Sequence, residues 1–159
     1  MKGLIINKMR SDYFTNMSEV FNLLPEEELN FMWLISNYEC NIYPSEQIPF
    51  DKDYVWMKGT ELKEILNQKE IMFIWGNFTS YSSDTELKDV LKYRLPFADG
   101  NKDLWRKDIQ LSNPLSNTEL ISWDGSVFLA LSKNTSIIEL LKNNYPDNED
   151  LSRYNSDID

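Results

Sequence analysis

The chain contains no histidine among its 159 residues, and it contains a single cysteine, Cys40. Without histidine there is no Ser-His-Asp or Cys-His catalytic group, and the common zinc ligand sets and a histidine pH switch are also excluded. A single cysteine permits no internal disulfide and no multi-cysteine zinc site. Any enzyme hypothesis must therefore use carboxylates, Lys, Tyr, Ser or Thr. The sequence predicts no catalytic residue, no metal site and no cofactor.

Long apolar runs and a secretory signal are also missing. Every apolar run in the sequence is far shorter than the roughly 18 residues that a membrane helix requires. The amino terminus has only the apolar residues Leu4, Ile5 and Ile6 before Asn7 and Lys8, too few for a signal peptide. We therefore expect a cytoplasmic protein that does not enter a membrane.

Basic residues are scarce, since 16 Lys and Arg stand against 26 Asp and Glu, and the net charge is −10. The shortage is greatest in residues 11–51, which contain eight acidic side chains and no Lys or Arg. Phosphate contacts supply most of the affinity for nucleic acids, so an acidic chain without a basic stripe argues against DNA and RNA. It argues equally against an anionic membrane surface. A basic protein partner is compatible with this charge.

The clearest structural pattern lies in residues 119–132, where two apolar runs flank Asp124 and Gly125. Asp-Gly between such runs is typical of a tight hairpin, because both central residues of a type I′ turn need φ > 0. The apolar residues around the turn are Trp123, Val127, Phe128, Leu129 and Leu131. The chain then enters an amphipathic segment, residues 134–141, which predicts a short helix directly after the hairpin.

Strands and short helices alternate in the rest of the chain. Apolar or alternating runs predict strands near residues 3–7, 31–35, 38–43, 54–57 and 71–75. Helical spacing indicates helices that begin at Ser11 or Asp12, at Thr60 and at the capping box of Ser83. This pattern fits an α+β domain with a mostly antiparallel sheet and three or four short helices.

We expect these elements to form one domain over residues 1–145, because no repeat or linker divides that part of the sequence. Residues 96–117 carry the weakest pattern, with one short strand near residues 109–111. Residues 146–159 contain five acidic side chains against Arg153 and few large apolar ones. They are therefore predicted to form an acidic, loosely ordered tail.

Residues 99–103 are similar to the start of a calcium loop, with oxygen ligands at alternate positions. The similarity ends at the sixth position, where Leu104 stands in place of the Gly of the sharp turn. At the twelfth position Gln110 stands in place of the bidentate Glu. A plain polar turn is therefore favoured.

Asp51 and Asp53 lie on the same side of the segment if it is extended, and such a pair is suited to Mg²⁺. One pair without a third ligand or a phosphate-binding loop favours a solvated start of a strand instead. Cys40 lies beside Glu39 and has no histidine to lower its pKa. A small core residue or an inert thiol is therefore favoured over a nucleophile.

Tryptophan occurs at five positions, and Trp33, Trp56, Trp75 and Trp123 lie in strand-like runs. Core packing is favoured for them over stacking of bases or sugars, because a base-stacking platform normally comes with a basic groove. Trp105 is followed by Arg106 and Lys107, the one place where aromatic and basic residues coincide. Trp105 and Arg106 are therefore the predicted residues of a small contact site.

One set of short motifs spans the second half of the chain. It consists of Ile74-Trp-Gly76, Leu95-Pro-Phe97, residues 121–132 (ISWDGSVFLALS), Ile137-Ile138, Tyr145-Pro146, Glu149-Asp-Leu151 and Tyr154-Asn155. Together these motifs resemble a small family of uncharacterised proteins from Bacillus and related bacteria, known only as a domain of unknown function. The resemblance implies a bacterial cytoplasmic protein and transfers no catalytic residue.

The first hypothesis of function is a non-enzymatic, acidic protein-binding module whose partner is a basic protein. An immunity protein that neutralises a toxin domain is its concrete version. An acidic face accelerates encounter with a basic partner, although a plain solvated face is the simpler explanation of residues 11–51. The predicted contact residues are Asp12, Glu19, Glu26, Glu27, Glu28, Trp105 and Arg106.

The alternative hypothesis is a small-ligand binder or a carboxylate-based enzyme with an aromatic-lined pocket. A sugar-like ligand suits that chemistry. This hypothesis predicts a concave site in which at least one Asp or Glu is buried beside Trp or Tyr. The sequence predicts neither the catalytic roles of individual carboxylates nor the oligomeric state.

Overall fold

The computed structural model describes residues 1–7, 9, 16–50 and 52–158 of the chain. Its strands are β1 (Lys2–Ile6), β2 (Met32–Cys40), β3 (Tyr54–Lys58), β4 (Phe73–Tyr81), β5 (Thr118–Trp123), β6 (Val127–Ser132) and β7 (Asn148–Asp150). Its helices are α1 (Met17–Phe21), α2 (Glu26–Leu29), α3 (Gly59–Gln68), α4 (Leu87–Val90), α5 (Thr135–Asn144) and α6 (Leu151–Asp157), with one 3-10 turn, η1 (Lys102–Trp105). The predicted α+β class is confirmed.

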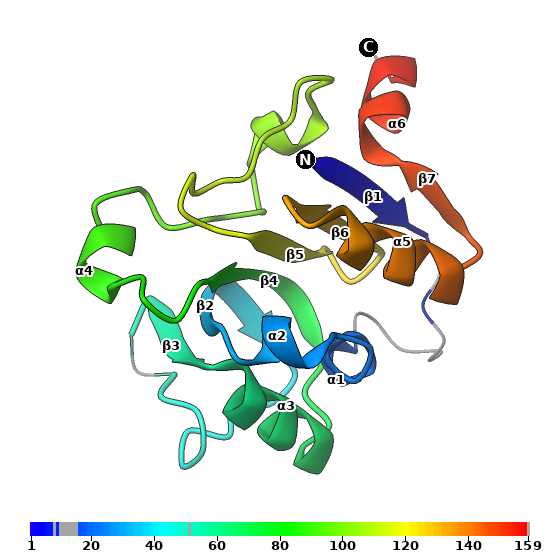
Figure 1. Ribbon diagram of the computed structural model, residues 1–159. Helices are drawn as coiled ribbons and strands as arrows, with labels where there is room; N and C mark the ends of the chain where they lie inside the picture. Colours follow the sequence, from blue (N-terminus) through cyan, green and yellow to red (C-terminus); the bar gives the residue numbers. More distant parts are fainter. Residues whose placement is uncertain (8, 10–15, 51, 159) are drawn as a thin grey trace.

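All the strands of the described residues belong to one sheet, in the order β3-β2-β4-β5-β6-β1-β7. Every neighbouring pair in that order is antiparallel, which confirms the predicted kind of sheet. β1 lies between β6 and β7, so the amino-terminal strand is enclosed by the carboxy-terminal part of the chain (Figure 1).

The hairpin predicted at Asp124 and Gly125 is confirmed by β5 and β6, in which Trp123 pairs with Val127. The φ angles are 48° at Asp124 and 62° at Gly125, the positive values that a type I′ turn requires. The predicted helix follows as α5, and the side chain of Asn134 caps its amino end.

The predicted helices correspond to α1, α3, α4 and α5, although α1 has only five residues and α4 only four. Two predicted starts are wrong, because the side chain of Asn16 caps α1, and α4 begins at Leu87 after Glu86 without the capping box of Ser83. Two further helices lie outside those predictions. The first, α2, is a single turn directly after Pro25, in a segment that was expected to be a polar connector. The second, α6, lies in the segment that was expected to be a tail.

Residues 146–158 differ from the loosely ordered tail that their composition predicts. Within them, β7 pairs with β1 from Ile6↔Asn148 to Leu4↔Asp150. In α6, Leu151 is fully buried in the core. Composition alone does not predict this order. One strand pairing and a few buried side chains are enough to hold the segment against the sheet, although its other residues are polar.

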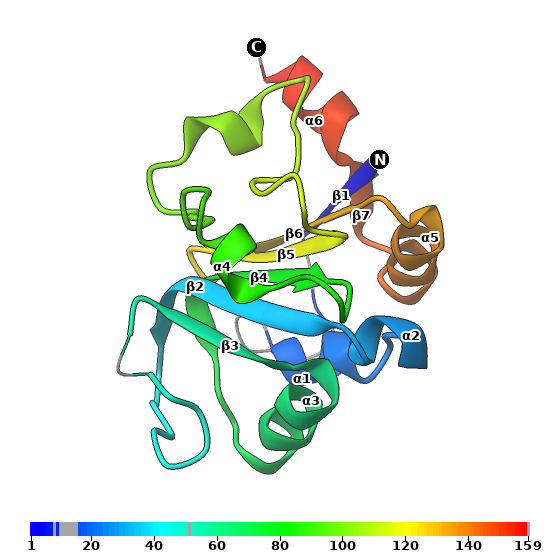
Figure 2. The same cartoon turned by 60° about the vertical axis from the view of Figure 1, so that its left-hand side comes forward.

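Each face of the sheet has its own core, because successive residues of a strand point to opposite faces. The helix face is covered by α1, α2, α3 and α5, and its strand residues include Leu4, Ile6, Trp33, Phe78, Leu120 and Phe128. The loop face is covered by residues 86–117, which we call the covering segment, and by α6 (Figure 2). Its strand residues include Ile5, Leu34, Tyr81, Ile121 and Leu129.

The tryptophans and the cysteine take different places in these cores. Trp33 is fully buried on the helix face, with its ring centroid 4.8 Å from that of Phe21. Trp75, Trp105 and Trp123 are half-buried and meet edge to face on the loop face. Cys40 is buried, and burial followed by the charge of Glu39 raises its pKa to about 12, which agrees with an inert thiol.

The described part of the chain contains no helix that is both long enough and apolar enough to cross a membrane. Within the same residues, no three His, Cys, Asp or Glu side chains are grouped closely enough to hold a metal ion.

Candidate ligand pocket

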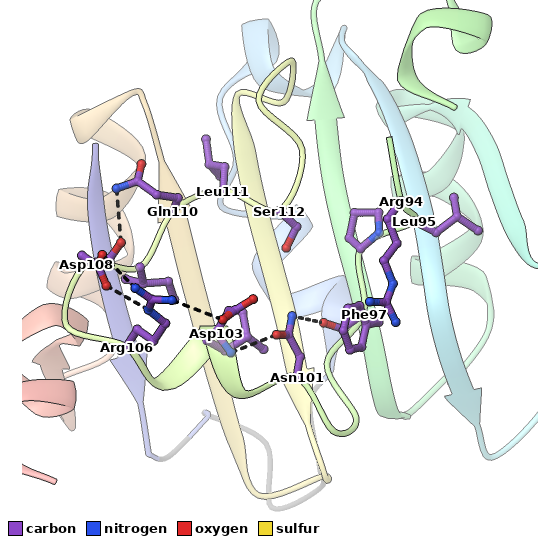
Figure 3. Close-up of a pocket in the computed structure, with 13 residues that line it drawn as sticks. Arg94, Leu95, Phe97, Asn101, Asp103, Arg106, Asp108, Gln110, Leu111 and Ser112 are labelled. Atoms are coloured by element: carbon purple, nitrogen blue, oxygen red, sulfur yellow. Dashed lines mark hydrogen bonds and ion pairs between the residues drawn. The ribbon is translucent and has the colours of Figure 1, made fainter. Parts of the chain in front are cut away.

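A pocket with a volume of about 450 Å³ opens on the loop face, within the covering segment. Residues 94–97 form one side of it and residues 101–112 the other, and both pass in front of the sheet (Figure 3). Its lining residues are Arg94, Leu95, Pro96, Phe97, Asn101, Asp103, Leu104, Arg106, Asp108, Ile109, Gln110, Leu111 and Ser112. The pocket therefore combines an apolar interior with several charged side chains.

A bulge in β2 fastens the first side of the pocket. The register of β2 against β4 shifts after Ser36, and Asn37 there has a φ of 50°, which Asn tolerates better than most residues. Ser36 Oγ donates a hydrogen bond to the carbonyl of Pro96 at 2.7 Å. Asn37 Oδ1 accepts from the backbone N–H groups of Ala98 and Asp99 at 2.8 and 3.1 Å. The bulge thus holds residues 96–99 through side chains.

Two asparagines fasten the second side. Asn101 Nδ2 donates to the carbonyl of Phe97 at 2.8 Å, and its Oδ1 accepts from the N–H of Asp103 at 3.0 Å, so this residue joins the two sides (Figure 3). Asn155 of α6 is buried, and its Nδ2 donates to the carbonyls of Leu104 and Arg106 at 3.0 and 2.9 Å. These bonds replace the regular backbone pairing that the irregular segment lacks.

Charge is unevenly distributed around the pocket. Arg106 makes two hydrogen bonds to Asp108, from Nε to Oδ1 at 3.1 Å and from Nη2 to Oδ2 at 3.2 Å. Its Nη1 lies 3.8 Å from Oδ1 of Asp103, so two carboxylates share one guanidinium. The hydrogen bonds between Arg106 and Asp108 raise the pKa of Arg106 and lower the pKa of Asp108. The residues of this side that line the pocket therefore have one negative charge in excess, while Lys102 and Lys107 of the same segment are not lining residues.

Arg94 lies on the opposite side and is differently placed (Figure 3). Its Cζ is 4.0 Å from the centroid of the Phe97 ring, a cation–π contact that orients the guanidinium. The guanidinium forms no ion pair with any carboxylate of the described residues. Arg94 is thus a positive charge of the pocket that no described carboxylate neutralises.

A buried glutamate lies directly behind the pocket wall. Glu119 of β5 is 0% exposed and accepts from Ser112 twice, from the backbone N–H to Oε1 at 2.9 Å and from Oγ to Oε2 at 2.8 Å. Asn77 Nδ2 of β4 donates to the same Oε2 at 2.9 Å. Burial raises the pKa of Glu119, and the hydrogen bonds from Ser112 and Asn77 oppose the increase. Glu119 therefore joins the pocket wall to the sheet without lining the pocket.

The alternative hypothesis predicted a concave site with a buried carboxylate beside Trp or Tyr. The concave site is present, and its aromatic lining residue is Phe97. The pKa of buried Tyr81 is raised first by its own burial and also by the nearby charge of Glu119. The buried carboxylate and a tyrosine thus lie close together, but behind Ser112 and outside the cavity itself.

The predicted contact residues do not form one surface. Asp12 lies outside the described residues. Glu26 and Glu27 are exposed on α2, and Glu19 is half-buried on α1, so these three belong to the helix face. Arg106 lines the pocket on the loop face, where Trp105 also packs. The structure therefore brings Arg106 to the pocket and Trp105 to the core of the loop face, and leaves the acidic residues on the other face.

Glu28 corrects the predicted acidic docking surface, because it is 2% exposed and cannot contact a partner. Its Oε1 accepts from Ser80 Oγ at 2.5 Å, and its Oε2 accepts from Asn117 Nδ2 at 2.9 Å. Burial raises its pKa against these hydrogen bonds. The sequence suggested a solvated run of three glutamates, but a single helical turn directs the third one at the sheet.

Several residues that line the pocket were not predicted as site residues, namely Arg94, Phe97, Asn101, Asp108 and Ser112. They lie in the segment whose pattern was weakest, because side chains from distant elements determine its shape. Glu119 did leave a signal. It shares the alternation of Ile121 and Trp123 in β5, so a charged residue was due to face the same core as two apolar ones.

The magnesium pair and the calcium-like segment lie in different parts of the sequence, and Asn101 and Asp103 of the calcium-like segment line the pocket. Asp51 lies outside the described residues, so the pair with Asp53 is not described. The calcium-like segment forms a turn at Gly100, where φ is 78°, and leads into η1. The plain turn favoured for that segment is what the backbone forms.

Comparisons of the chain with family models, with curated proteins and with solved structures found no match. The resemblance to a Bacillus-type family therefore stays a prediction.

Proposed function

We propose that the protein binds a small ligand in the pocket of residues 94–112, with Arg94 as the anchor for an anionic group of that ligand. The observation that carries the proposal is the unpaired guanidinium of Arg94, held over Phe97 at the side of a cavity. Arg94 is exposed, and its orientation on a cavity wall suits its guanidinium to a carboxylate or phosphate. The function is binding, and carboxylate-based catalysis is its alternative.

The lining of the cavity supports the same proposal. Pockets for small molecules usually combine a mainly apolar lining with a few placed polar groups, and their volumes are about 300–1,000 Å³. This pocket has a volume of about 450 Å³, and its apolar residues include the buried Leu104 and Ile109. Its walls are tied to β2, β5 and α6 by side-chain hydrogen bonds, so the cavity is formed before a ligand enters.

A thermal-shift screen with small metabolites that carry an anionic group, including carboxylic acids, amino acids and phosphates, tests the proposal. We expect at least one of them to raise the melting temperature of the wild-type protein. The Arg94→Gln variant should lose that increase. Arg153→Gln is the matched control, since it removes the same charge from an exposed position of α6, and it should keep the increase. A screen without a stabilising anion, or an equal loss in both variants, would contradict the proposal.

A second proposal retains the docking of a basic protein on the helix face. It rests on Glu26 and Glu27, which are both exposed on α2 within the stretch that has no Lys or Arg. A pull-down from the native host at low and moderate salt should then retain one basic partner, more weakly at the higher salt. The double variant Glu26→Gln, Glu27→Gln should lose this partner. Retention unchanged by the double variant would exclude this surface.

A further inference from the structure

The charges of the pocket have opposite signs on its two sides. Arg94 brings an unpaired positive charge to the first side. On the second side Asp103 and Asp108 share the single guanidinium of Arg106. Asp108 takes the two short hydrogen bonds, and Asp103 keeps only a contact of 3.8 Å. Of the two carboxylates that line the pocket, Asp103 therefore has the less compensated charge, and its side chain is 82% exposed.

We infer that the ligand is a small zwitterion of the amino-acid or short-peptide class, whose carboxylate binds Arg94 and whose ammonium group binds Asp103. This inference rests on the proposed binding function of the pocket. Arg94 and Asp103 lie on opposite sides, with the Asn101 bridge between them (Figure 3). A ligand with both charges satisfies each side, while a ligand with one charge leaves the other side uncompensated.

The lining also constrains the apolar part of the ligand. The apolar residues that line the pocket are Leu95, Pro96, Phe97, Leu104, Ile109 and Leu111. The polar amide of Asn101 offers little to a ligand, because its Nδ2 and Oδ1 already bind the backbone. The ligand is thus expected to have an apolar side chain, as leucine, phenylalanine or a dipeptide of the two has.

Isothermal titration calorimetry with matched probes tests the inference. The probes are leucine, phenylalanine and leucyl-phenylalanine, each with two analogues, one without the ammonium group and one without the carboxylate. We expect at least one zwitterion to bind roughly tenfold or more tightly than either of its analogues, the effect of one charge-assisted hydrogen bond. An analogue without its ammonium group that binds as tightly as its parent would overturn the inference and leave the binding of anions intact.

Two variants assign the charges. Asp103→Asn should weaken binding of the zwitterion roughly tenfold and leave binding of the analogue without an ammonium group unchanged. Arg94→Gln should weaken binding of the zwitterion to a similar extent and leave binding of the analogue without a carboxylate unchanged. Asp157→Asn and Arg153→Gln, on exposed positions of α6, are the matched controls and should change neither. If no zwitterion binds while the anion screen finds another ligand, this inference fails and the proposed function stands. If neither experiment finds a ligand, both fail.

Discussion

Glu28 and Glu119 lie on opposite faces of one sheet and are held in closely similar ways. Each is buried, and each accepts hydrogen bonds from one serine and one asparagine. Neither forms an ion pair with a described Lys or Arg. The two glutamates differ in the surroundings of their partners. The partners of Glu28, Ser80 and Asn117, do not line the pocket, whereas Ser112, the partner of Glu119, does.

The comparison separates stability from function. A buried carboxylate that accepts hydrogen bonds from several elements holds those elements together, on either face of the sheet. On the helix face such a bond contributes only to the fold. On the loop face the same bond sets the position of a pocket wall, so its loss should affect binding as well as stability. The predictions below test this difference in order of expected size.

Glu119→Ala should have the largest effect on stability. It leaves three donor groups without their acceptor, namely the buried Nδ2 of Asn77 and the N–H and Oγ of half-buried Ser112. We expect the free energy of unfolding to fall by about 3–5 kcal/mol, measured by urea denaturation. Glu119→Gln is the control and should cost far less, because the Ser112 hydroxyl can turn to accept from the new amide and Asn77 can turn its unpaired Oδ1 towards it. A loss below about 1 kcal/mol in the alanine variant would contradict this role.

Glu28→Ala should have the next largest effect, because it leaves two donors, Ser80 Oγ and Asn117 Nδ2, without their acceptor. We expect a loss of about 2–3 kcal/mol in the same urea experiment. Ligand affinity, measured at a temperature where the variant remains folded, should stay at the wild-type value. A loss of binding that matched that of Glu119→Ala would remove the distinction between the two faces.

The pH dependence of stability should follow from the raised pKa of both glutamates, whose ordinary value is 4.5. A folded protein with a raised carboxyl pKa still holds protons that the unfolded chain has released. The contribution of these groups to the free energy of unfolding is therefore complete below the ordinary pKa and falls as pH rises towards the folded pKa. The fall should be roughly 1.4 kcal/mol for each unit by which a pKa is raised.

Urea denaturation of the wild type and of Glu119→Gln over about pH 4 to 8 measures this fall by difference, which removes the contribution of other carboxylates. The variant should show the smaller fall, since only Glu28 still titrates with a raised pKa in it. Identical pH profiles for the two proteins would contradict a raised pKa at Glu119.

Local patterns predicted the fold far better than the site. The turn at Asp124 and Gly125 was predictable because the requirement for positive φ is met within two residues. The covering segment was not, because Ser36, Asn37 and Asn155 hold it from elements far away in sequence. No pattern within residues 94–112 records those partners.

The two glutamates show the same limit. Glu28 belongs to a run of three acidic residues, and such a run is typical of a solvated face. The single turn of α2 nevertheless buries Glu28. In Glu119 the alternation of β5 pointed inward, yet the donors that make its burial tolerable come from β4 and the covering segment. Burial of a charge is a property of the assembled sheet.

The most direct test of the pocket as the functional site is a two-dimensional ¹⁵N–¹H NMR titration of the full chain with leucyl-phenylalanine and with the best anion of the thermal-shift screen. The account predicts that shift changes concentrate at the amides of residues 94–112 and weaken across the sheet towards Glu28. Changes centred on Glu26 and Glu27 of α2, or none at saturating ligand, would contradict it.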